Sequence, residues 1–189
     1  MKAISLPLPG LVLIERVLHR DARGFFSERF HAGKFEEFGL PTQFVQDNHS
    51  RSVPGVLRGL HYQHTPGQGK LVSVTRGRIW DVAVDLRADS PTFGQHSGLE
   101  LSDVNGHLLW IPAGFAHGFC VLGEEAADVV YSVDVHYHPG GEAGISWDDP
   151  DLAIAWPIEQ PIVSQKDRWL SRFAAYRSAP VRWEAGVIR

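Results

Sequence analysis

The sequence predicts an all-β fold, a sandwich or a jelly-roll barrel, with helices only at its edges. Glycine (19) and proline (12) punctuate the 189 residues, and short runs rich in Val, Ile, Leu, Phe and Trp lie between them. Each run has the length of a strand, and several alternate with the two-residue period of a half-buried strand. Helix signals are few, which is typical of sandwiches and barrels.

Eight runs predict strands, at residues 11–17, 24–30, 70–75, 79–86, 98–101, 107–111, 115–122 and 129–137. Within 79–86, Val82, Val84 and Leu86 share one face, while Asp81, Ala83 and Asp85 share the other. The Arg-Gly-Arg sequence at 76–78 predicts a hairpin turn that joins two of these strands.

Two segments predict helices. Residues 31–38 form a short helix ended by Gly39, and residues 164–177 form a longer one with Ser164 as its cap and Asp167 three positions later. The sequence contains no repeat, linker or low-complexity segment. Residues 1–189 are therefore expected to form one domain, with a C-terminal helix and tail at about 164–189.

Charge and cysteine content exclude several classes of protein. The net charge is −4, from 18 basic and 22 acidic residues, so we expect no nucleic-acid partner. The single cysteine cannot form an intrachain disulfide, which fits a reducing compartment. Pro7, Pro9 and Gly10 interrupt the first apolar patch, and no run has the length of a membrane span. We therefore expect a cytoplasmic protein without a membrane partner.

The ten histidines raise the question of a metal site. His61 and His64 are three residues apart, so they face opposite sides of a regular strand, and no acidic residue follows before Asp81. Zinc or iron needs three or more converging ligands, so we expect no bound metal. His61 can instead act as a general base if a carboxylate orients it. From spacing alone, a strand histidine bonded to a backbone carbonyl remains the favoured interpretation.

Other candidates also have two interpretations. Tyr131 and Tyr137 share a face of one strand, where one can donate a proton and the other can stack on a flat ligand, but core aromatics are commoner. Asp167 either favours the start of the last helix or orients a histidine. Cys120 fits a buried thiol better than a nucleophile.

Eight segments, in order, carry a resemblance to a known family. They are DARGFFSERF (21–30), FVQDNHSRS (44–52), GVLRGLHYQ (55–63), GKLVSVTRGRIWDVAVDLRADSPTFG (69–94), LLWIPAGFAHGFCVL (108–122), VVYSVDVHYHP (129–139), GISWDDPDLAIAWP (144–157) and SQKD (164–167). With these segments the chain resembles the dTDP-4-dehydrorhamnose 3,5-epimerases. The tail after Arg168 has no counterpart in the resemblance.

The resemblance implies a cupin-type jelly roll that uses no metal and no cofactor. It also implies a homodimer with exchanged N-terminal strands. The implied substrate is dTDP-4-dehydro-6-deoxy-D-glucose, whose C4 ketone acidifies the protons on C3 and C5. The enzyme removes each proton from one face of the sugar and returns one on the other.

The resemblance also implies roles for residues. His61 is the general base, Asp167 orients it, Tyr131 is the acid, and Lys70 is the cation beside the developing enolate oxygen. Tyr137 is the stacking platform for thymine. The other substrate-contacting positions are Arg23, Glu28, Gln46, Asp47, Asn48, Arg58, His117, Glu142 and Lys166. Arginines suit the diphosphate because a guanidinium makes paired hydrogen bonds to its oxygens.

Three alternatives stay open at this point. A related epimerase inverts only C3 or only C5 of a similar sugar. A metal cupin requires bound metal, and a binding module holds the nucleotide sugar without proton exchange. The presence of His61, Asp167, Lys70 and Tyr131 together argues against a binding module, because a binder needs no acid and base. The full set of matched positions favours double epimerisation.

Overall fold

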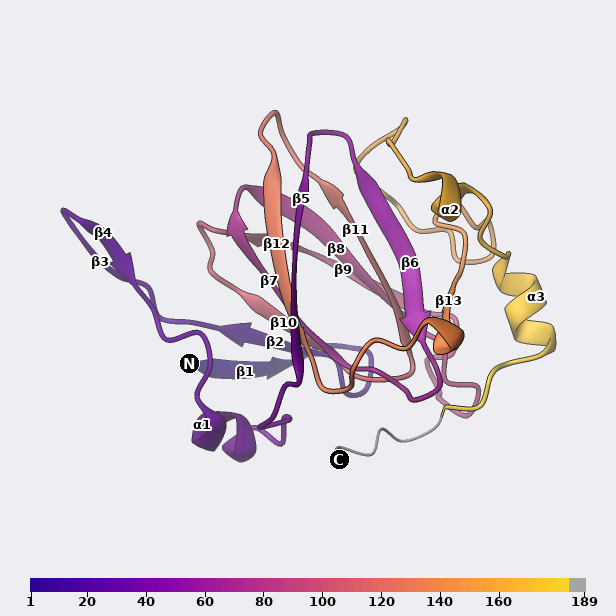
Figure 1. Ribbon diagram of the computed structural model, residues 1–189, viewed down its shortest axis with the longest axis horizontal. Helices are drawn as coiled ribbons and strands as arrows, with labels where there is room; N and C mark the ends of the chain where they lie inside the picture. The colour runs from indigo at the N-terminus through magenta and orange to yellow at the C-terminus, as the bar shows by residue number, and fades with distance from the viewer. Residues whose placement is uncertain (184–189) are drawn as a thin grey trace.

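The computed structural model describes residues 1–183, and two antiparallel sheets form its body (Figure 1). The first sheet has six strands in the order β1-β2-β10-β7-β12-β5. Their bounds are Lys2–Ser5 (β1), Val12–Glu15 (β2), Leu108–Ile111 (β10), Lys70–Arg76 (β7), Ala127–Val133 (β12) and Gln46–Ser52 (β5).

The second sheet has five strands in the order β13-β6-β11-β8-β9. Their bounds are Glu142–Gly144 (β13), Leu57–Gln63 (β6), Phe115–Val121 (β11), Arg78–Asp85 (β8) and His96–Ser102 (β9). A separate hairpin, β3 (His19–Asp21) with β4 (Gly24–Phe26), extends away from the body in Figure 1. The two facing sheets make this a jelly roll of the cupin type, as the sequence predicts.

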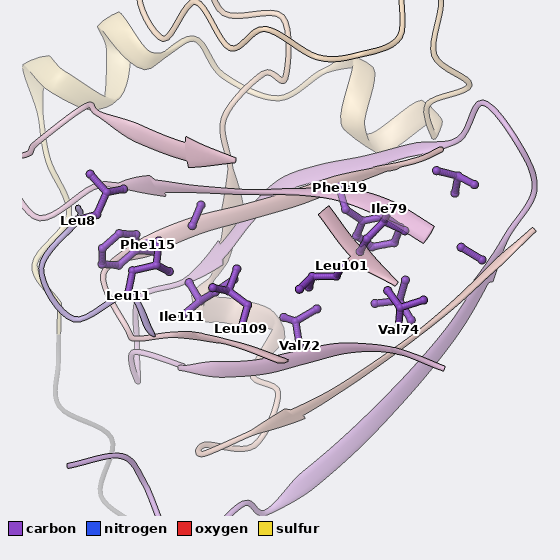
Figure 2. Close-up of a cluster of buried hydrophobic side chains, with 14 residues drawn as sticks. Leu8, Leu11, Val72, Val74, Ile79, Leu101, Leu109, Ile111, Phe115 and Phe119 are labelled. Carbon is purple, nitrogen blue, oxygen red and sulfur yellow. The ribbon is translucent and has the colours of Figure 1, made fainter. Parts of the chain in front are cut away.

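Apolar side chains from both sheets fill the space between them (Figure 2). Val72, Leu109 and Val129 come from the six-stranded sheet, and Ile79 and Phe119 come from the five-stranded sheet. This core accounts for the alternation in the sequence, because every second residue of these strands points inward. This core packs the two sheets against each other, while the ladders of hydrogen bonds join the strands within each sheet.

The outer faces of both sheets are also covered. Helix α1 (Ala32–Glu37) places Phe35 against Ile14 and Trp110 of the six-stranded sheet. On the five-stranded sheet, α3 (Phe173–Ser178) packs Phe173 and Tyr176 against the side chains of β6 and β8. Strands buried on both faces read as continuous apolar runs, and all seven residues of β11 are buried.

Helix α1 confirms the predicted helix at 31–38. His31 caps its N-terminus, and Gly39 follows its end with a φ of +69°. The predicted buried thiol is also confirmed, since Cys120 is fully buried and burial raises its pKa to about 11. No helix in residues 1–183 has both the length and the apolar character that crossing a bilayer requires.

The predicted hairpin at 76–78 is wrong. Strands β7 and β8 belong to different sheets, so the chain crosses here from one layer to the other. Gly77 has a φ of +74°, and a Cβ at this position would lie 2.7 Å from the carbonyl oxygen of Ala126. The Arg-Gly-Arg sequence is compatible with a hairpin within one sheet and with a crossing between two sheets. Only the packing of the two layers decides which of these forms.

The single C-terminal helix at 164–177 is also wrong. The segment forms α2 (Gln165–Arg168) and α3, with an extended stretch between them. In this stretch the carbonyl of Ser171 accepts a hydrogen bond from the Ser146 amide, beside a parallel bridge between Ile145 and Ser171. Pairing with the edge of the sheet therefore interrupts the helix. Residues 184–189 of the expected tail lie outside the described residues.

Three predicted strands end earlier than expected, and the run at 11–17 is a strand only over Val12–Glu15. The run at 24–30 continues as a strand only to Phe26, and the run at 129–137 ends at Val133. Tyr137 therefore lies in the loop beyond β12 and does not share a strand face with Tyr131.

Candidate active site

Two cavities open at one end of the space between the sheets, and three side chains line both of them. The cavities measure about 500 and 290 Å³ and share His61, Lys70 and Tyr131. His61 belongs to β6 of the five-stranded sheet, whereas Lys70 (β7) and Tyr131 (β12) belong to the six-stranded sheet. A ligand in this space therefore lies between a histidine from one sheet and a tyrosine from the other.

His61 is held by a buried carboxylate. Its Nε2 donates to Oδ1 of Asp167 at 2.7 Å, and Asp167 is only 2% exposed. Burial acts to raise the pKa of Asp167, but the hydrogen bonds from His61 and the Gly59 amide outweigh it and lower the pKa. Asp167 is thus an anion that fixes the ring, and Nδ1 is the ring nitrogen left for a ligand.

Helix α2 places Asp167 within hydrogen-bond distance of His61. Ser164 caps the helix by accepting a hydrogen bond from the Asp167 amide at 3.0 Å, as the sequence predicts. The Asp167 side chain also reaches β6, where the Gly59 amide donates to it at 3.3 Å. Of the two interpretations of Asp167, the structure supports orientation of a histidine.

Glycine at position 59 permits a close approach of β6 and β11 beside the site. Its φ is +126°, and a Cβ there would lie 2.6 Å from the Cα of Gly118. The register between the strands shifts at this point, between His117 and Phe119. A side chain at 59 would separate the strands that carry His61 and His117.

Lys70 and Tyr131 have perturbed pKa values with clear physical causes. Desolvation lowers the pKa of Lys70 to about 8, against the opposing attraction of Glu142 and Asp81. Burial raises the pKa of the Tyr131 phenol, with a further contribution from Glu142, so the phenol holds its proton at neutral pH. The site therefore pairs a histidine with a protonated phenol and a cation, which is suited to moving protons next to a carbonyl.

A polar cluster lies at the edge of the site. The Tyr137 hydroxyl donates to Oε2 of Glu142 at 2.7 Å, and Lys166 lies 2.7 Å from Oε1 of the same carboxylate. Burial acts to raise the pKa of Glu142, but the hydrogen bonds from Lys166 and Tyr137 lower it overall. Gln46 accepts from the Tyr137 amide and donates to Asn48, which brings both amides to the smaller cavity.

Two further predicted residues line the larger cavity. Arg58 donates to the Ser52 hydroxyl at 2.9 Å and lies on β6, three residues before His61. His117 on β11 is in register with His61, so both rings share one face of the sheet.

Three predicted residues are not brought to the site within this chain. Arg23 lies at the end of the β3–β4 hairpin, paired with Asp21, and Glu28 pairs with Lys34 near α1. Asp47 alternates with Gln46 and Asn48 and so faces the opposite side of β5. There it accepts from the Ser132 hydroxyl beside a separate cavity of about 750 Å³.

The structure adds residues that the sequence analysis missed. Ser50 lines the larger cavity, and its buried hydroxyl has no hydrogen-bond partner within residues 1–183. The alternation of β5 after Gln46 and Asn48 was the signal that could have identified it. Asp81 lies behind His117 and is bonded to it. In residues 1–183 the His, Cys, Asp and Glu side chains form no group of three suited to a metal ion.

Comparisons with known proteins agree with this geometry. Residues 5–175 match the family model described as dTDP-4-dehydrorhamnose 3,5-epimerase. The Pseudomonas aeruginosa protein of that name is 52% identical over 176 residues, which cover 92% of this chain and 97% of the relative.

Solved structures share the fold. The Legionella pneumophila dTDP-6-deoxy-D-glucose-3,5-epimerase, in complex with dTDP-4-keto-L-rhamnose, has a TM-score of 0.91 and 47% identity, covering 96% of this chain and 97% of the other. A 3'-monoepimerase from Streptomyces bikiniensis, in complex with dTDP-quinovose, has a TM-score of 0.87 and 34% identity, covering 95% and 91%. The match over residues 5–175 and the 52% identity to the Pseudomonas aeruginosa protein show that the chain belongs to the dTDP-4-dehydrorhamnose 3,5-epimerase family.

Proposed function

We infer that this protein is a carbohydrate epimerase that converts dTDP-4-dehydro-6-deoxy-D-glucose to dTDP-4-dehydro-L-rhamnose. The observation that carries the inference is the His61–Asp167 pair, which faces Tyr131 from the opposite sheet across one cavity. Inversion needs a base on one face of a carbon and an acid on the other, and the two sheets supply them from opposite sides.

The proposed chemistry uses the atoms that the structure leaves free. With Nε2 bonded to Asp167, Nδ1 of His61 takes the proton from C3 or C5. The electron pair of the broken C–H bond moves into the C4 carbonyl, and the ammonium of Lys70 stabilises the enolate oxygen. Tyr131 then donates its proton to the same carbon from the other face. Proton exchange with water resets His61 and Tyr131 before the second carbon reacts.

The nucleotide half of the substrate is proposed to bind along the edge of the site. Tyr137, half exposed in the loop after β12, offers a flat ring for thymine. Arg58 and Lys166 line the larger cavity and supply positive charge for the diphosphate. Gln46 and Asn48 contribute amides to the smaller cavity.

We propose that the protein works as a homodimer with exchanged N-terminal strands. The β3–β4 hairpin extends from the body and exposes Phe25 and Phe26, the latter 73% exposed (Figure 1). Arg23 and Glu28 match substrate-contacting positions of the family, yet both lie away from the site of their own chain. A hairpin that docks on a second copy would cover the two phenylalanines and carry Arg23 towards that copy's site.

Sedimentation velocity of the purified protein measures this association. We expect a dimer, and Phe26→Asp is expected to weaken it by placing a charge in the covered surface. A monomer at micromolar concentration with full activity would refute the dimer proposal.

Proton exchange tests the function directly. The protein is incubated with the dehydro sugar nucleotide in D₂O, C3 and C5 are followed by NMR, and a downstream reductase with NADPH traps the product. Deuterium at both carbons with a rhamnose-configured product supports the proposal, and deuterium at one carbon identifies a mono-epimerase. His61→Ala is the control, expected to abolish turnover while dTDP binding stays nearly intact. Absence of exchange with the unmodified protein would refute an epimerase.

Two broader expectations stay predictions: that residues 1–189 form one domain and that the protein is cytoplasmic. Limited proteolysis tests the first, since a single domain yields no stable internal fragment. Fractionation of the source cells tests the second. A cytoplasmic location fits the use of a nucleotide-activated sugar as substrate.

A further inference from the structure

A second histidine–carboxylate pair lies next to the first. Nε2 of His117 donates to Oδ2 of Asp81 at 2.8 Å. His117 is 7% exposed and Asp81 is fully buried on β8. Since His117 is in register with His61, the two pairs lie side by side on the inner face of one sheet.

The other oxygen of Asp81 is unusual. Oδ1 is buried and has no hydrogen-bond partner in the part of the chain that the structure describes. Buried carboxylate oxygens are normally satisfied, because an unpaired one is costly to desolvate. The attraction of Asp81, together with that of Glu142, acts to raise the pKa of Lys70, which lines the larger cavity.

Asp85 shows that buried carboxylates on β8 do not in general lack hydrogen-bond partners. It lies on β8, four residues further along and on the same face, and it is also fully buried. Both of its oxygens are occupied, by Arg87, Ser90 and Thr92. Asp85 therefore closes a turn, whereas Asp81 leaves one oxygen unused beside the site.

We propose that Asp81 is a positioning residue for the epimerisation: it fixes His117 with Nδ1 towards the substrate, and it places a carboxylate behind the cavity that Lys70 lines. The proposal rests on the proposed function. Because Nε2 of His117 is bonded to Asp81, Nδ1 is the ring atom left to meet a ligand in the larger cavity. Lys70 lines the same cavity, so Nδ1 of His117 and the ammonium of Lys70 face one region, with Asp81 behind His117.

Several other charged and titratable groups surround Lys70, and the test must separate Asp81 from them. The anions are Glu142 on β13 and Asp167 on α2. The remaining groups are His61 and Arg58 on β6, Tyr131 on β12, His117 on β11 and Lys166 on α2. Removing only the charge of Asp81 leaves all of these in place.

The experiment compares Asp81→Asn with the matched control Asp85→Asn in the full-length protein. The first readout is the titration of the Lys70 ammonium by NMR, with lysine labelled at Cε and the signal assigned by Lys70→Met. We expect Asp81→Asn to lower the Lys70 midpoint by about one pH unit. Asp85→Asn is expected to leave the midpoint unchanged, even if it lowers the melting temperature.

The second readout is kcat for exchange at C3 and C5, together with the pH profile of kcat/KM. Asp81→Asn is expected to lower kcat about tenfold or more and to move the alkaline limb to lower pH. Asp81→Glu keeps the charge but displaces the carboxylate, so it should restore the Lys70 midpoint without restoring the rate. If Asp81→Asn does not fold, Asp81→Glu still tests the positioning role, because its displaced carboxylate should lower the rate.

Two results would overturn the proposal. One is an unchanged Lys70 midpoint and pH profile in folded Asp81→Asn, and the other is an equal effect of Asp85→Asn. Failure of the unmodified protein to exchange C3 or C5 would instead refute the proposed function. The NMR titration needs no turnover, so it distinguishes the two failures.

Discussion

Replacing Asp167 with asparagine removes one negative charge from a buried position and keeps the shape of the side chain. In the unmodified protein the Asp167 carboxylate accepts from two donors, His61 Nε2 at 2.7 Å and the Gly59 amide at 3.3 Å. Asparagine has one acceptor oxygen and one NH₂ group. If the NH₂ group faces His61, the ring must move its proton to Nδ1, and the atom that should abstract the substrate proton is then blocked.

The magnitude follows from the hydrogen bond that is lost. A hydrogen bond to a charged group contributes roughly 1.5–3 kcal/mol, and each 1.36 kcal/mol in the barrier changes the rate tenfold. We therefore expect kcat to fall roughly 10- to 150-fold, and further if the wrong tautomer dominates. Stability should change little, because removing a buried charge offsets part of the lost hydrogen bond.

The assay measures deuterium exchange at C3 and C5 by NMR, with urea unfolding in parallel. Asp167→Asn should exchange both carbons slowly while unfolding within about 1 kcal/mol of the unmodified protein. The matched control is Asp149→Asn, whose carboxylate accepts from the Phe173 amide at the start of α3, away from both cavities. This control should lose stability and keep its rate. An Asp167→Asn protein with kcat within about threefold of the unmodified enzyme would refute the orienting role.

Three further predictions concern the acid, the cation and the core. Tyr131→Phe should still allow deuterium exchange, because abstraction survives, but it should suppress inversion; if exchange and inversion fall together, Tyr131 is not a separate acid. If Lys70 acts as a cation, its pKa of about 8 predicts that kcat declines as pH rises through that value, and Lys70→Met should remove most of the rate at every pH. A kcat that rises above pH 8 would contradict this sign. Leu109→Ala removes a side chain that is 1% exposed in the inter-sheet core, so urea unfolding should show a loss of about 2–5 kcal/mol, and a loss below about 1 kcal/mol would contradict the core assignment.

The relation between sequence and structure is clearest in the strands. Alternation predicted the faces of β8 correctly, because the side-chain period of a strand depends only on the backbone. Val82 and Val84 contact the outer helices, and Ala83 contacts the inter-sheet core. The prediction of a hairpin at 76–78 was wrong because a glycine turn carries no information on which sheet the next strand joins.

The candidate site likewise combines residues that the sequence pointed to with contacts that only the packing decided. The family resemblance pointed to His61, Lys70, Tyr131 and Asp167 as site residues. The spacing of the residues by itself favoured a structural histidine. His61 and Asp167 are 106 positions apart, and only the packing of α2 against β6 joins them. Contacts at that separation depend on the whole arrangement of layers, which local patterns do not encode.

The sequence by itself determined the all-β class, the short helix at 31–38, the Ser164 cap and the family resemblance. These properties depend on local backbone preferences or on motifs that lie along the chain. Only the tertiary structure shows that Asp47 faces away from the cavity and that Arg23 and Glu28 do not line it. It also places Asp81 behind His117, with one oxygen that has no hydrogen-bond partner within residues 1–183. Each of these depends on which sheet faces which, because burial and charge compensation arise only when the two layers close on one another.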